Sequence, residues 1–434
     1  MSPKSKEMDR SINKGKMMYQ WAVDLFPICR SITGEGVRET LAYLKNEVDE
    51  LKLRSVNSGY KAFDWEVPDE WIIRDAYVKN KNGEKVIDFK KNNLHLVSYS
   101  EPIDKMVSYE ELAKHLHSIP DMPDAIPYAT SYYSRNWGFC LTHNDRLNLK
   151  EEEYHVFIDS DLSPGSMNYG EIVIPGNSKK EILLSTYICH PSMANNELSG
   201  PVVTLALSKY LLNQSNKYTY RIIFIPETIG SIVYLSKHLE HLQNNVIAGF
   251  NISCVGDDRS YSYLPSRTGA TLADRAAVYA LGHIGEFKKY SFLERGSDER
   301  QYCSPLVNLP ICSIMRSKFG SYPEYHTSMD NLQLISPEGL EGAYNVLIRA
   351  FDFIESSSIY KAVYPCEPQL GKRGLYPKIG AKKHPYEIKD MMNLLAYCDG
   401  KNDLAMIAEM LGKELGYLKK IAENLLSKNL IEEL

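Results

Sequence analysis

The sequence predicts an α/β fold with an inserted β-rich segment and a helical C-terminal unit. From Glu171 onward, short apolar runs typical of buried strands alternate with longer segments whose apolar residues have helical spacing. Between residues 64 and 152 there are short alternating segments, a turn at Asn82-Gly83 and a stretch rich in proline and tyrosine. Three helical segments then run from Ile388 to Leu434. We therefore expect three domains: residues 1–63 with 153–360, residues 64–152, and residues 361–434.

The expected elements can be justified in chain order. Two helices lie between Met17 and Leu53, and Gly34 and Gly36 interrupt the apolar periodicity between them. The α/β part follows, and Pro201 falls in the first turn of its first helix, where a missing N–H is tolerated. In order, its segments are the strands "EIVIPG" and "EILLSTYICH", the helix "LSGPVVTLALSKYLL", the strand "YRIIFIPE", the helix "GSIVYLSKHLEHL" and the strand "VIAGFNISCVG".

Composition excludes several classes of protein. The chain has 434 residues, a length that favours two or three domains. Its residues are 44% hydrophobic and 24% charged, which is typical of a globular protein. A net charge of −5 argues against a large binding surface for nucleic acid or an anionic membrane. No apolar run approaches the roughly 20 residues that span a bilayer. The polar N-terminus has no export signal, and the eight cysteines form no CxxC pair. We expect a cytoplasmic protein with free thiols and no membrane contact.

Polar residues follow the predicted strands, and the carboxyl ends of parallel strands are where α/β sheets bind ligands. His190 ends one strand, Glu227 ends the next, and Asp257 and Asp258 follow a third. His326 and Asp330 stand in a later segment. The stretch "ICHPSMANNELSGP" has two readings, a loop whose polar residues cap a helix or part of a metal site. Imidazole and carboxylate groups together suit Zn²⁺.

These motifs resemble those of the zinc aminopeptidases of the M28 type. "HPSMANNELSG" is similar to "HxD…GANDDGSG" of that family, "FIPETIGS" to "EExGLxGS", "FNISCVGD" to a strand with "NLDMVG", and "YHTSMDNLQLIS" to "HTxxDTxDxI". "CRSITGEGVRETL" and "CVGDDRSYSYLPSR" look like signatures of a bacterial M28-related group linked with polysaccharide biosynthesis. The resemblance implies a zinc-exopeptidase-like α/β/α sandwich with a mixed sheet, an inserted small β-rich domain and a C-terminal winged helix-turn-helix.

The resemblance also implies a ligand set, with departures. The family's bridging aspartate aligns with Asn196, its double glutamate with Pro226-Glu227, and its strand aspartate with Ser253. We expect Glu197 to take the place of Asn196, because a neutral amide offsets little of a metal ion's desolvation. The expected metal ligands, around one or two Zn²⁺ ions, are His190, Glu197, Asp257 and His326, with Glu227 as a fifth ligand or as the catalytic base.

This ligand set implies an amide hydrolase. Zinc would lower the pKa of a bound water toward about 7, and Glu227 would take its proton and return it to the leaving amine. We expect Arg30 to bind a substrate carboxylate, Asp298 or Glu299 to bind a free amine, and Arg300 or Tyr302 to stabilise the oxyanion. An ordinary salt bridge for Arg30 and a loop cap for Asp298 remain open alternatives. The inserted aromatics either line the cleft or form their own core, the latter being expected for most of Tyr132, Tyr133, Trp137 and Phe139.

The segment from Ile388 to Leu434 has the pattern of a winged helix-turn-helix. Its lysines are balanced by glutamates, so we expect protein contact or packing into a homo-oligomer, and no nucleic acid as partner. Two functions remain open. The first is a zinc aminopeptidase-like hydrolase acting on a small peptide or an amino-acyl or amino-sugar conjugate. The second is a non-catalytic binding or regulatory protein on a decayed peptidase scaffold, acting through its winged helix.

Overall fold

The computed structural model describes residues 13–375 and 386–434. The polar N-terminal residues behind the prediction of no export signal fall mostly outside this range. The chain forms two compact units that divide between Leu347 and Ile348, and each is described by itself. No helix in the described ranges has the length and apolar character needed to cross a membrane.

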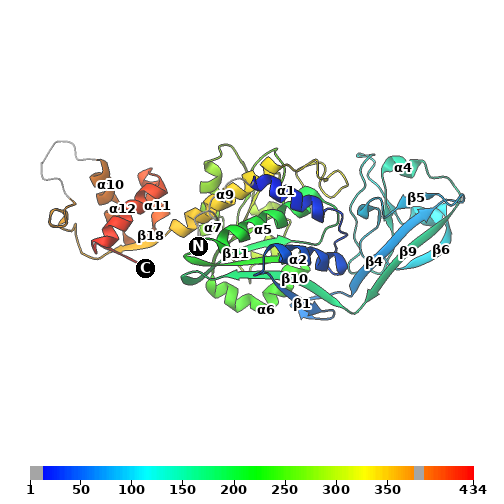
Figure 1. Ribbon diagram of the computed structural model, residues 1–434, viewed down its shortest axis with the longest axis horizontal. Helices are drawn as coiled ribbons and strands as arrows, with labels where there is room; N and C mark the ends of the chain where they lie inside the picture. Colours follow the sequence, from blue (N-terminus) through cyan, green and yellow to red (C-terminus); the bar gives the residue numbers. More distant parts are fainter. Residues whose placement is uncertain (1–12, 376–385) are drawn as a thin grey trace, which may run out of the picture. The chain divides into compact units, whose positions relative to one another are not determined.

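A mixed eight-stranded sheet is the centre of the first unit (Figure 1). Strands β11, β12, β13 and β16 are parallel, whereas β1, β10 and β14 join antiparallel. In spatial order the strands are β1 Lys52–Asn57, β10 Ser166–Ile174, β12 Tyr218–Ile225, β11 Ser178–Tyr187, β13 Val246–Asn251, β16 Ile311–Met315, β14 Ser262–Leu264 and β15 Lys288–Lys289. The predicted α/β fold with a mixed sheet is confirmed.

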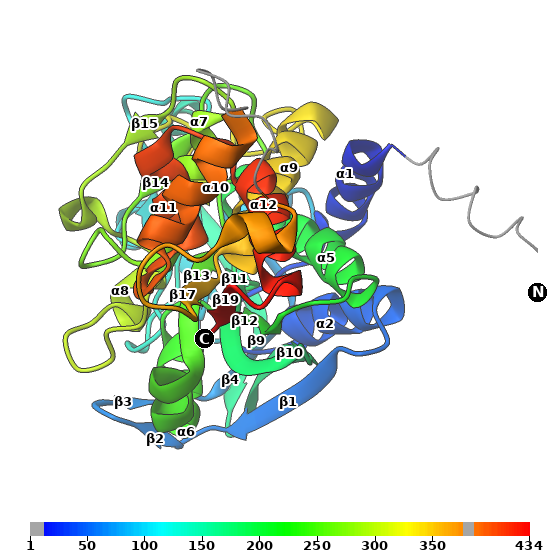
Figure 2. The same cartoon turned by 90° about the vertical axis from the view of Figure 1, so that its left-hand side faces the viewer.

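Helices cover both faces of this sheet, as Figure 2 shows for α1, α2 and α5 on one side and α6 and α8 on the other. Helix α5 is buried along most of its length because it packs between α1 and the central strands, and Pro201 lies in its first turn as predicted. The helices are α1 Lys14–Leu25, α2 Glu35–Glu47, α5 Ser199–Leu212, α6 Ile229–Asn245, α7 Leu272–Gly282, α8 Glu299–Tyr302 and α9 Pro337–Ser356, the last crossing into the second unit. A short π-helix, η4, runs from Ala194 to Leu198 directly before α5.

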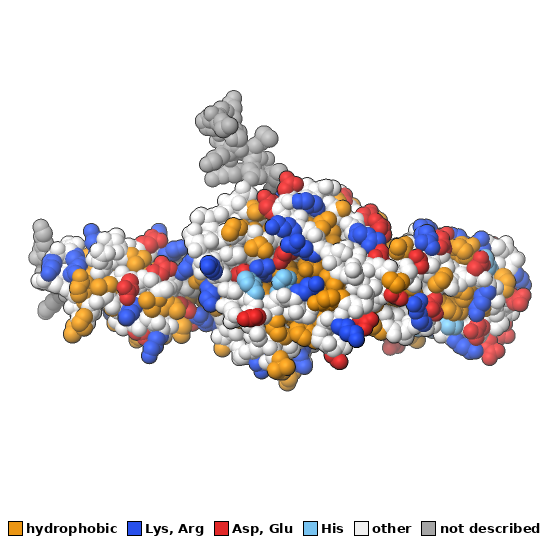
Figure 3. Space-filling model, turned by 90° about the horizontal axis from the view of Figure 1, so that it is seen from below, with side chains coloured by type: hydrophobic (Ala, Val, Ile, Leu, Met, Phe, Trp, Pro, Cys, Tyr) orange, Lys and Arg blue, Asp and Glu red, His pale blue; other side chains and the backbone are white. Residues whose placement is uncertain are grey.

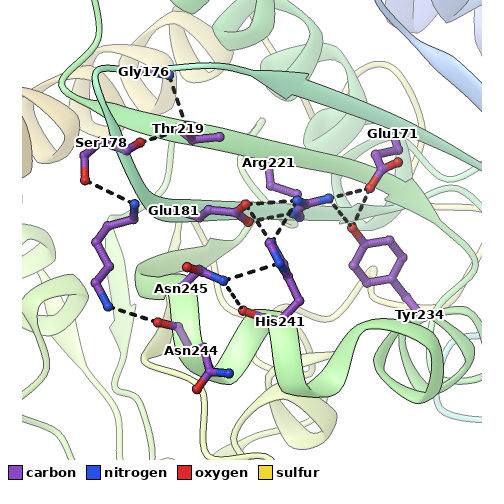
Figure 4. A network of polar contacts seen from close by, with 11 residues as sticks. Glu171, Gly176, Ser178, Glu181, Thr219, Arg221, Tyr234, His241, Asn244 and Asn245 are labelled. Carbon is purple, nitrogen blue, oxygen red and sulfur yellow. Dashed lines mark hydrogen bonds and ion pairs between the residues drawn. The ribbon is translucent and has the colours of Figure 1, made fainter.

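A buried ionic network ties α6 to the sheet (Figure 4). Arg221 on β12 bonds Glu171 on β10 at 2.7 Å and Glu181 on β11 at 2.7 Å. From α6, Tyr234 donates to Glu171, and His241 lies 2.8 Å from Glu181. Burial alone raises the pKa of Glu181, but the bonds from Arg221 and His241 outweigh it and leave the pKa below its usual value. On the face where α6 lies, histidine side chains stand beside lysines and arginines (Figure 3).

The inserted segment forms a second, antiparallel sheet in the order β5-β4-β9-β6 (Figure 1). The predicted turn at Asn82-Gly83 lies between β4 and β5, and Gly83 has a φ of 80° there. Strand β9 begins only after residue 152, so this sheet extends past the expected segment. The elements are β2 Lys61–Ala62, β3 Trp65–Glu66, β4 Glu70–Lys79, β5 Lys85–Asp88, η3 Asn93–His95, β6 Ile103–Ser108, α3 Tyr109–Ala113, β7 Leu116–His117, β8 Phe139–Cys140, α4 His143–Leu147 and β9 Glu153–Ser163.

The loop between α1 and α2 contacts the inserted segment. Thr33 Oγ1 accepts from the backbone N–H of Trp71 and lies 2.6 Å from Tyr99 Oη. Gly34 has a φ of 97°, and a Cβ at this position would stand 2.1 Å from the Trp71 carbonyl oxygen. Only glycine fits there without movement. The segment "SITGEG" therefore connects the α1–α2 loop to the inserted segment.

The second unit contains the three predicted helices and a small sheet in the order β18-β17-β19. Asp403 caps α11 by accepting from Met406 N, and Gly412 ends it with a φ of 60°. The elements are β17 Ile359–Ala362, η6 Leu370–Arg373, α10 Tyr386–Tyr397, β18 Asp399–Asp403, α11 Leu404–Leu411, α12 Leu415–Ser427 and β19 Ile431–Glu433.

Candidate functional site

A pocket of about 420 Å³ opens at the carboxyl ends of β11 and β12. His190, Glu227 and His326 provide its ionisable side chains, and loops of the inserted segment provide much of the opposite wall. The lining residues are Ile32, Trp65, Tyr128, Thr130, Tyr132, Tyr133, Cys189, His190, Glu227, Thr228, Ile229 and His326.

His190 and Glu227 meet because their strands are neighbours. β11 ends at Tyr187 and β12 at Ile225, and the two strands pair in parallel with these residues in register. His190 Nε2 lies 3.7 Å from Glu227 Oε2. Behind them the Glu227 backbone N–H donates to Cys189 Sγ at 3.2 Å. The strand pairing thus places an imidazole and a carboxylate together, as the sequence predicted from their positions.

His326 reaches the same pocket from the loop after β16. Its ring stacks on Tyr325 with centroids 3.9 Å apart, and its centroid lies 5.4 Å from that of His190. Its Nε2 atom is buried and has no hydrogen-bond partner. Its φ is 56°, a left-handed conformation that is rare for a bulky residue and marks strain at functional sites. Thr228, which follows Glu227, has a φ of 64°, so two neighbours of the pocket are strained.

The other nitrogen of His190 faces the interior. Nδ1 lies 2.9 Å from Glu197 Oε2 and 3.5 Å from Cys189 Sγ. Three buried residues on this side have possible ligand atoms close enough together to share a metal ion: Cys189, His190 and Glu197. Burial raises the pKa of the Cys189 thiol well above its usual value, so this sulfur is a poor metal ligand. The pocket side of His190 is therefore the better place for an ion.

Arg30 lies beside Glu197 in the protein interior. Its Nε lies 3.5 Å from Glu197 Oε1 and donates to the His190 carbonyl oxygen at 3.0 Å. Its Nη1 donates to the Leu25 carbonyl oxygen, and the side chain has no exposed surface. The expected contact with a substrate carboxylate is corrected, because Arg30 is fully buried. It is an interior ion pair, the alternative that the sequence left open.

Burial sets the charge of the central groups. It lowers the pKa of His190 and of His326 to about 3, with help from the Arg30 charge in the first case and from His190 in the second. Both imidazoles are neutral at neutral pH. Burial, and then the neighbouring Asp298, raises the pKa of Glu227 to about 8. Burial also raises the pKa of Glu197 to about 8 against the opposing Arg30 charge.

The remaining predicted residues lie around this centre, outside the pocket lining. Asp298 Oδ1 accepts from the Thr228 N–H and the Ser231 hydroxyl, while its buried Oδ2 has no partner. Arg300 donates to Thr228 Oγ1. Tyr302 is fully buried with its hydroxyl 2.8 Å from Ser185 Oγ, so the expected oxyanion contact of Tyr302 is corrected.

Asp257 is occupied by protein donors. Its carboxylate accepts from the N–H and hydroxyl of Ser317, from the Asn195 side-chain amide and from the Arg259 N–H. The structure does not bring it into the pocket with His190. Asp330 plays a similar part, accepting from the N–H groups of Ala194, Asn195 and Asn196. These two carboxylates hold the loop and π-helix that carry Glu197.

Sequence reasoning named Tyr132 and Tyr133 as residues that either line the cleft or form a core, but missed Trp65, Tyr128 and Thr130. The Tyr128 ring lies 5.3 Å from both histidine rings, its N–H donates to the His326 carbonyl oxygen, and its hydroxyl is 2.5 Å from that of Tyr132. Tyr132 and Tyr133 line the pocket, whereas Phe139 is core and Trp137 stacks on His115. The signal was the density of tyrosines in residues 128–133.

The pocket fits a zinc ion through its donor chemistry. Two neutral imidazoles and a carboxylate converge on it, the donor types that Zn²⁺ prefers. The unpartnered, buried Nε2 of His326 is a second sign, because buried polar atoms usually have a hydrogen-bond partner and this one lines the pocket beside His190 and Glu227.

The chain is similar to several known proteins. A family model described as a domain of unknown function (DUF4910) matches residues 19–357, and a winged helix-turn-helix model matches residues 358–433. A Clostridium acetobutylicum protein, provisionally named a polysaccharide biosynthesis protein with an aminopeptidase-like domain, is 44% identical over 99% of both chains. The predicted winged helix is thereby confirmed.

Two solved structures are also similar. One, provisionally named a peptidase, is from Clostridium acetobutylicum; it has a TM-score of 0.88 and 44% identity, and covers 97% of this chain and 96% of its own. The other is a zinc aminopeptidase from Bacillus subtilis, with a TM-score of 0.57 and 14% identity over 77% of this chain and 93% of its own. At that identity the likeness shows the fold alone, which is aminopeptidase-like as expected.

Proposed function

The chain belongs to the DUF4910 family and has an aminopeptidase-like fold, and on this premise we propose that it is a zinc-dependent amide hydrolase. The proposed substrate is a small peptide or an amino-acyl or amino-sugar conjugate. The relative's name, which refers to polysaccharide biosynthesis, supports the last of these. The proposed location is the cytoplasm. The observation that carries the proposal is the convergence of His190, Glu227 and the unpartnered Nε2 of His326 on one pocket.

The proposal assigns each central residue a role. His190 and His326 would hold one zinc ion through their pocket-facing nitrogens, and both are neutral as metal binding requires. When bound, zinc lowers the pKa of a coordinated water and polarises the amide carbonyl. Glu227 takes the proton of the attacking water and gives it to the leaving amine. Its raised pKa of about 8 suits a group that both accepts and donates a proton near neutral pH.

Glu197 takes a different role from the one expected of it. With Oε2 on His190 Nδ1 and Oε1 beside Arg30, it orients the ring so that Nε2 faces the pocket. Asp257, whose oxygens accept from four protein donors, is left out of the proposed ligand set. Asn196 and Ser253 are neutral where the related family has carboxylates. For these reasons the proposal uses one ion rather than two.

A substrate screen tests this function. Zinc-loaded protein is incubated with amino-acyl amides, dipeptides and N-acyl amino sugars, and released amine is measured. Turnover of one class that disappears with a chelator and returns with Zn²⁺ supports the proposal. Stoichiometric zinc without turnover of any class would favour the second candidate, a binding or regulatory protein acting through its winged helix. The neutral Asn196 and Ser253, both buried, are the observations that favour that candidate.

A further inference from the structure

Two aromatic side chains that line the pocket are exposed to solvent. Trp65, on β3, is 39% exposed, and Tyr133 is 57% exposed. Their centroids are 5.7 Å apart in an edge-to-face contact, and both line the pocket. Large aromatic side chains are usually well buried, and exposed ones that gather at a cavity mark a binding surface.

Hydroxyl groups accompany these rings. Thr130, Thr228 and the hydroxyl pair of Tyr128 and Tyr132 belong to the same lining. Among the described lining residues there is no lysine or arginine, and Glu227 is the one carboxylate. A ligand in the outer part of this pocket meets aromatic faces and neutral hydrogen-bonding groups, and no full charge.

A second hollow lies next to the pocket. This hollow measures about 180 Å³ and shares Tyr132 and Tyr133 with the first. Its further lining includes Asp69, Ser131, Ser134 and Arg135, and Arg135 pairs with Asp69 at 3.3 Å. A ligand that extends past Tyr133 therefore meets hydroxyl, carboxylate and guanidinium groups, which bond neighbouring hydroxyls well. An apolar peptide side chain would instead require an enclosed apolar pocket.

We propose that Trp65 and Tyr133 form a binding subsite for the pyranose rings of a neutral oligosaccharide or glycoconjugate. A sugar ring has faces of C–H groups and an edge of hydroxyls. The C–H face matches the electron-rich aromatic faces, and the hydroxyls match the threonines and the second hollow. The subsite rests on the proposed function, since it would hold the sugar part of a conjugate whose amide lies at His190 and Glu227.

Saturation-transfer NMR tests the subsite without any need for turnover. Chitotriose and maltotriose are titrated into metal-free and zinc-loaded full-length protein, and trialanine serves as the peptide probe. At least one of the two sugars should bind in both metal states. Trp65→Ala and Tyr133→Ala should each weaken that binding about tenfold, as loss of one aromatic contact does. Trp65→Phe should retain most of it. Tyr364→Ala, which removes another exposed ring, is the matched control and should leave it unchanged.

The outcomes separate the subsite from the hydrolase. Sugar binding that depends on Trp65 in a protein that takes up no zinc would retain the subsite and overturn the proposed function. Failure of both sugars to bind folded protein would overturn the subsite, as would binding that survives the Trp65→Ala, Tyr133→Ala double variant. Binding of trialanine that is lost with Trp65 while neither sugar binds would also overturn it, in favour of a peptide pocket. The circular dichroism spectrum of each variant confirms that it folds.

Discussion

The Nδ1 atom of His190 lies 2.9 Å from the Oε2 atom of Glu197, on the side of the ring away from Glu227. This contact fixes which nitrogen of His190 is available to the pocket. It also explains why a fully buried glutamate stands in the π-helix at 194–198. A carboxylate behind a histidine raises the ring's basicity and holds its orientation, an arrangement common around catalytic metals.

Replacing the carboxyl group of Glu197 with an amide should weaken zinc binding. Glu197→Gln keeps the shape but lowers the strength of the contact to His190, and we expect a loss of about 10–100-fold in zinc affinity. Asn196→Ala should have a smaller effect, because the Asn196 amide bonds Tyr187 and not His190. Competition with a chromophoric chelator measures both affinities. A larger loss in Asn196→Ala would contradict the role given to Glu197.

Removing the Arg30 charge should destabilise the protein. Above about pH 8, where Glu197 is charged, Arg30→Met leaves its carboxylate buried without a cation, which typically costs about 3–5 kcal/mol. The double variant Arg30→Met, Glu197→Gln should recover part of this loss because no unpaired charge remains. Urea unfolding of the metal-free variants, followed by fluorescence, gives the comparison. Equal stability of Arg30→Met and wild type would show that the ion pair is unimportant.

The raised pKa of Glu227, which lies near Asp298, predicts that zinc affinity depends on pH. The metal-free Glu227 carboxyl keeps its proton up to about pH 8, and above that pH its negative charge, near His190 Nε2, attracts the zinc cation that the two histidines would hold. The histidines, with pKa values of about 3, bind no competing proton. Zinc affinity should therefore rise with pH up to about 8.

Asp298→Asn should move this rise to lower pH. The substitution removes a negative charge beside Glu227 and so lowers its pKa, while the retained Oδ1 can still accept from Thr228 and Ser231. Glu50→Gln, on an exposed turn, is the control. The measurement compares the zinc affinities of wild type, Asp298→Asn and Glu50→Gln between about pH 6 and about pH 9. A shift in the control of the same size would trace the effect to net charge alone.

Glu227→Gln distinguishes a catalytic base from a residue that only precedes α6. As the base, Glu227 contributes about 10²–10⁴-fold to turnover, so the glutamine variant should fold, still hold zinc through the two histidines with lower affinity, and lose activity on the substrate found by the screen. As a simple helix cap, it should cost only about 0.5–2 kcal/mol of stability. Asp258→Asn is the control, because this acid also follows a predicted strand but is exposed. Full activity of folded Glu227→Gln removes Glu227 from the mechanism.

The sequence could predict the meeting of His190 and Glu227, because adjacent parallel strands bring their carboxyl ends together. It could not predict the burial of Arg30. Arginine side chains are mostly exposed, whereas Arg30 contacts His190 and Glu197, which are distant from it in sequence. Asp257 lies outside the pocket because hydrogen bonds from Ser317 and Asn195 set the direction of its side chain. Both partners are distant from it in sequence. Trp65 escaped notice because its strand is only two residues long.

The zinc content of the purified protein tests the central claim most directly. Wild-type protein, the His190→Ala, His326→Ala double variant and a His238→Ala, His283→Ala control are purified without added metal, incubated with Zn²⁺ and desalted, and zinc is measured by mass spectrometry. We expect one zinc per chain in wild type and control, and none in the His190, His326 variant. A wild-type protein that holds no zinc, or a His190, His326 variant that holds as much as wild type, would contradict the account.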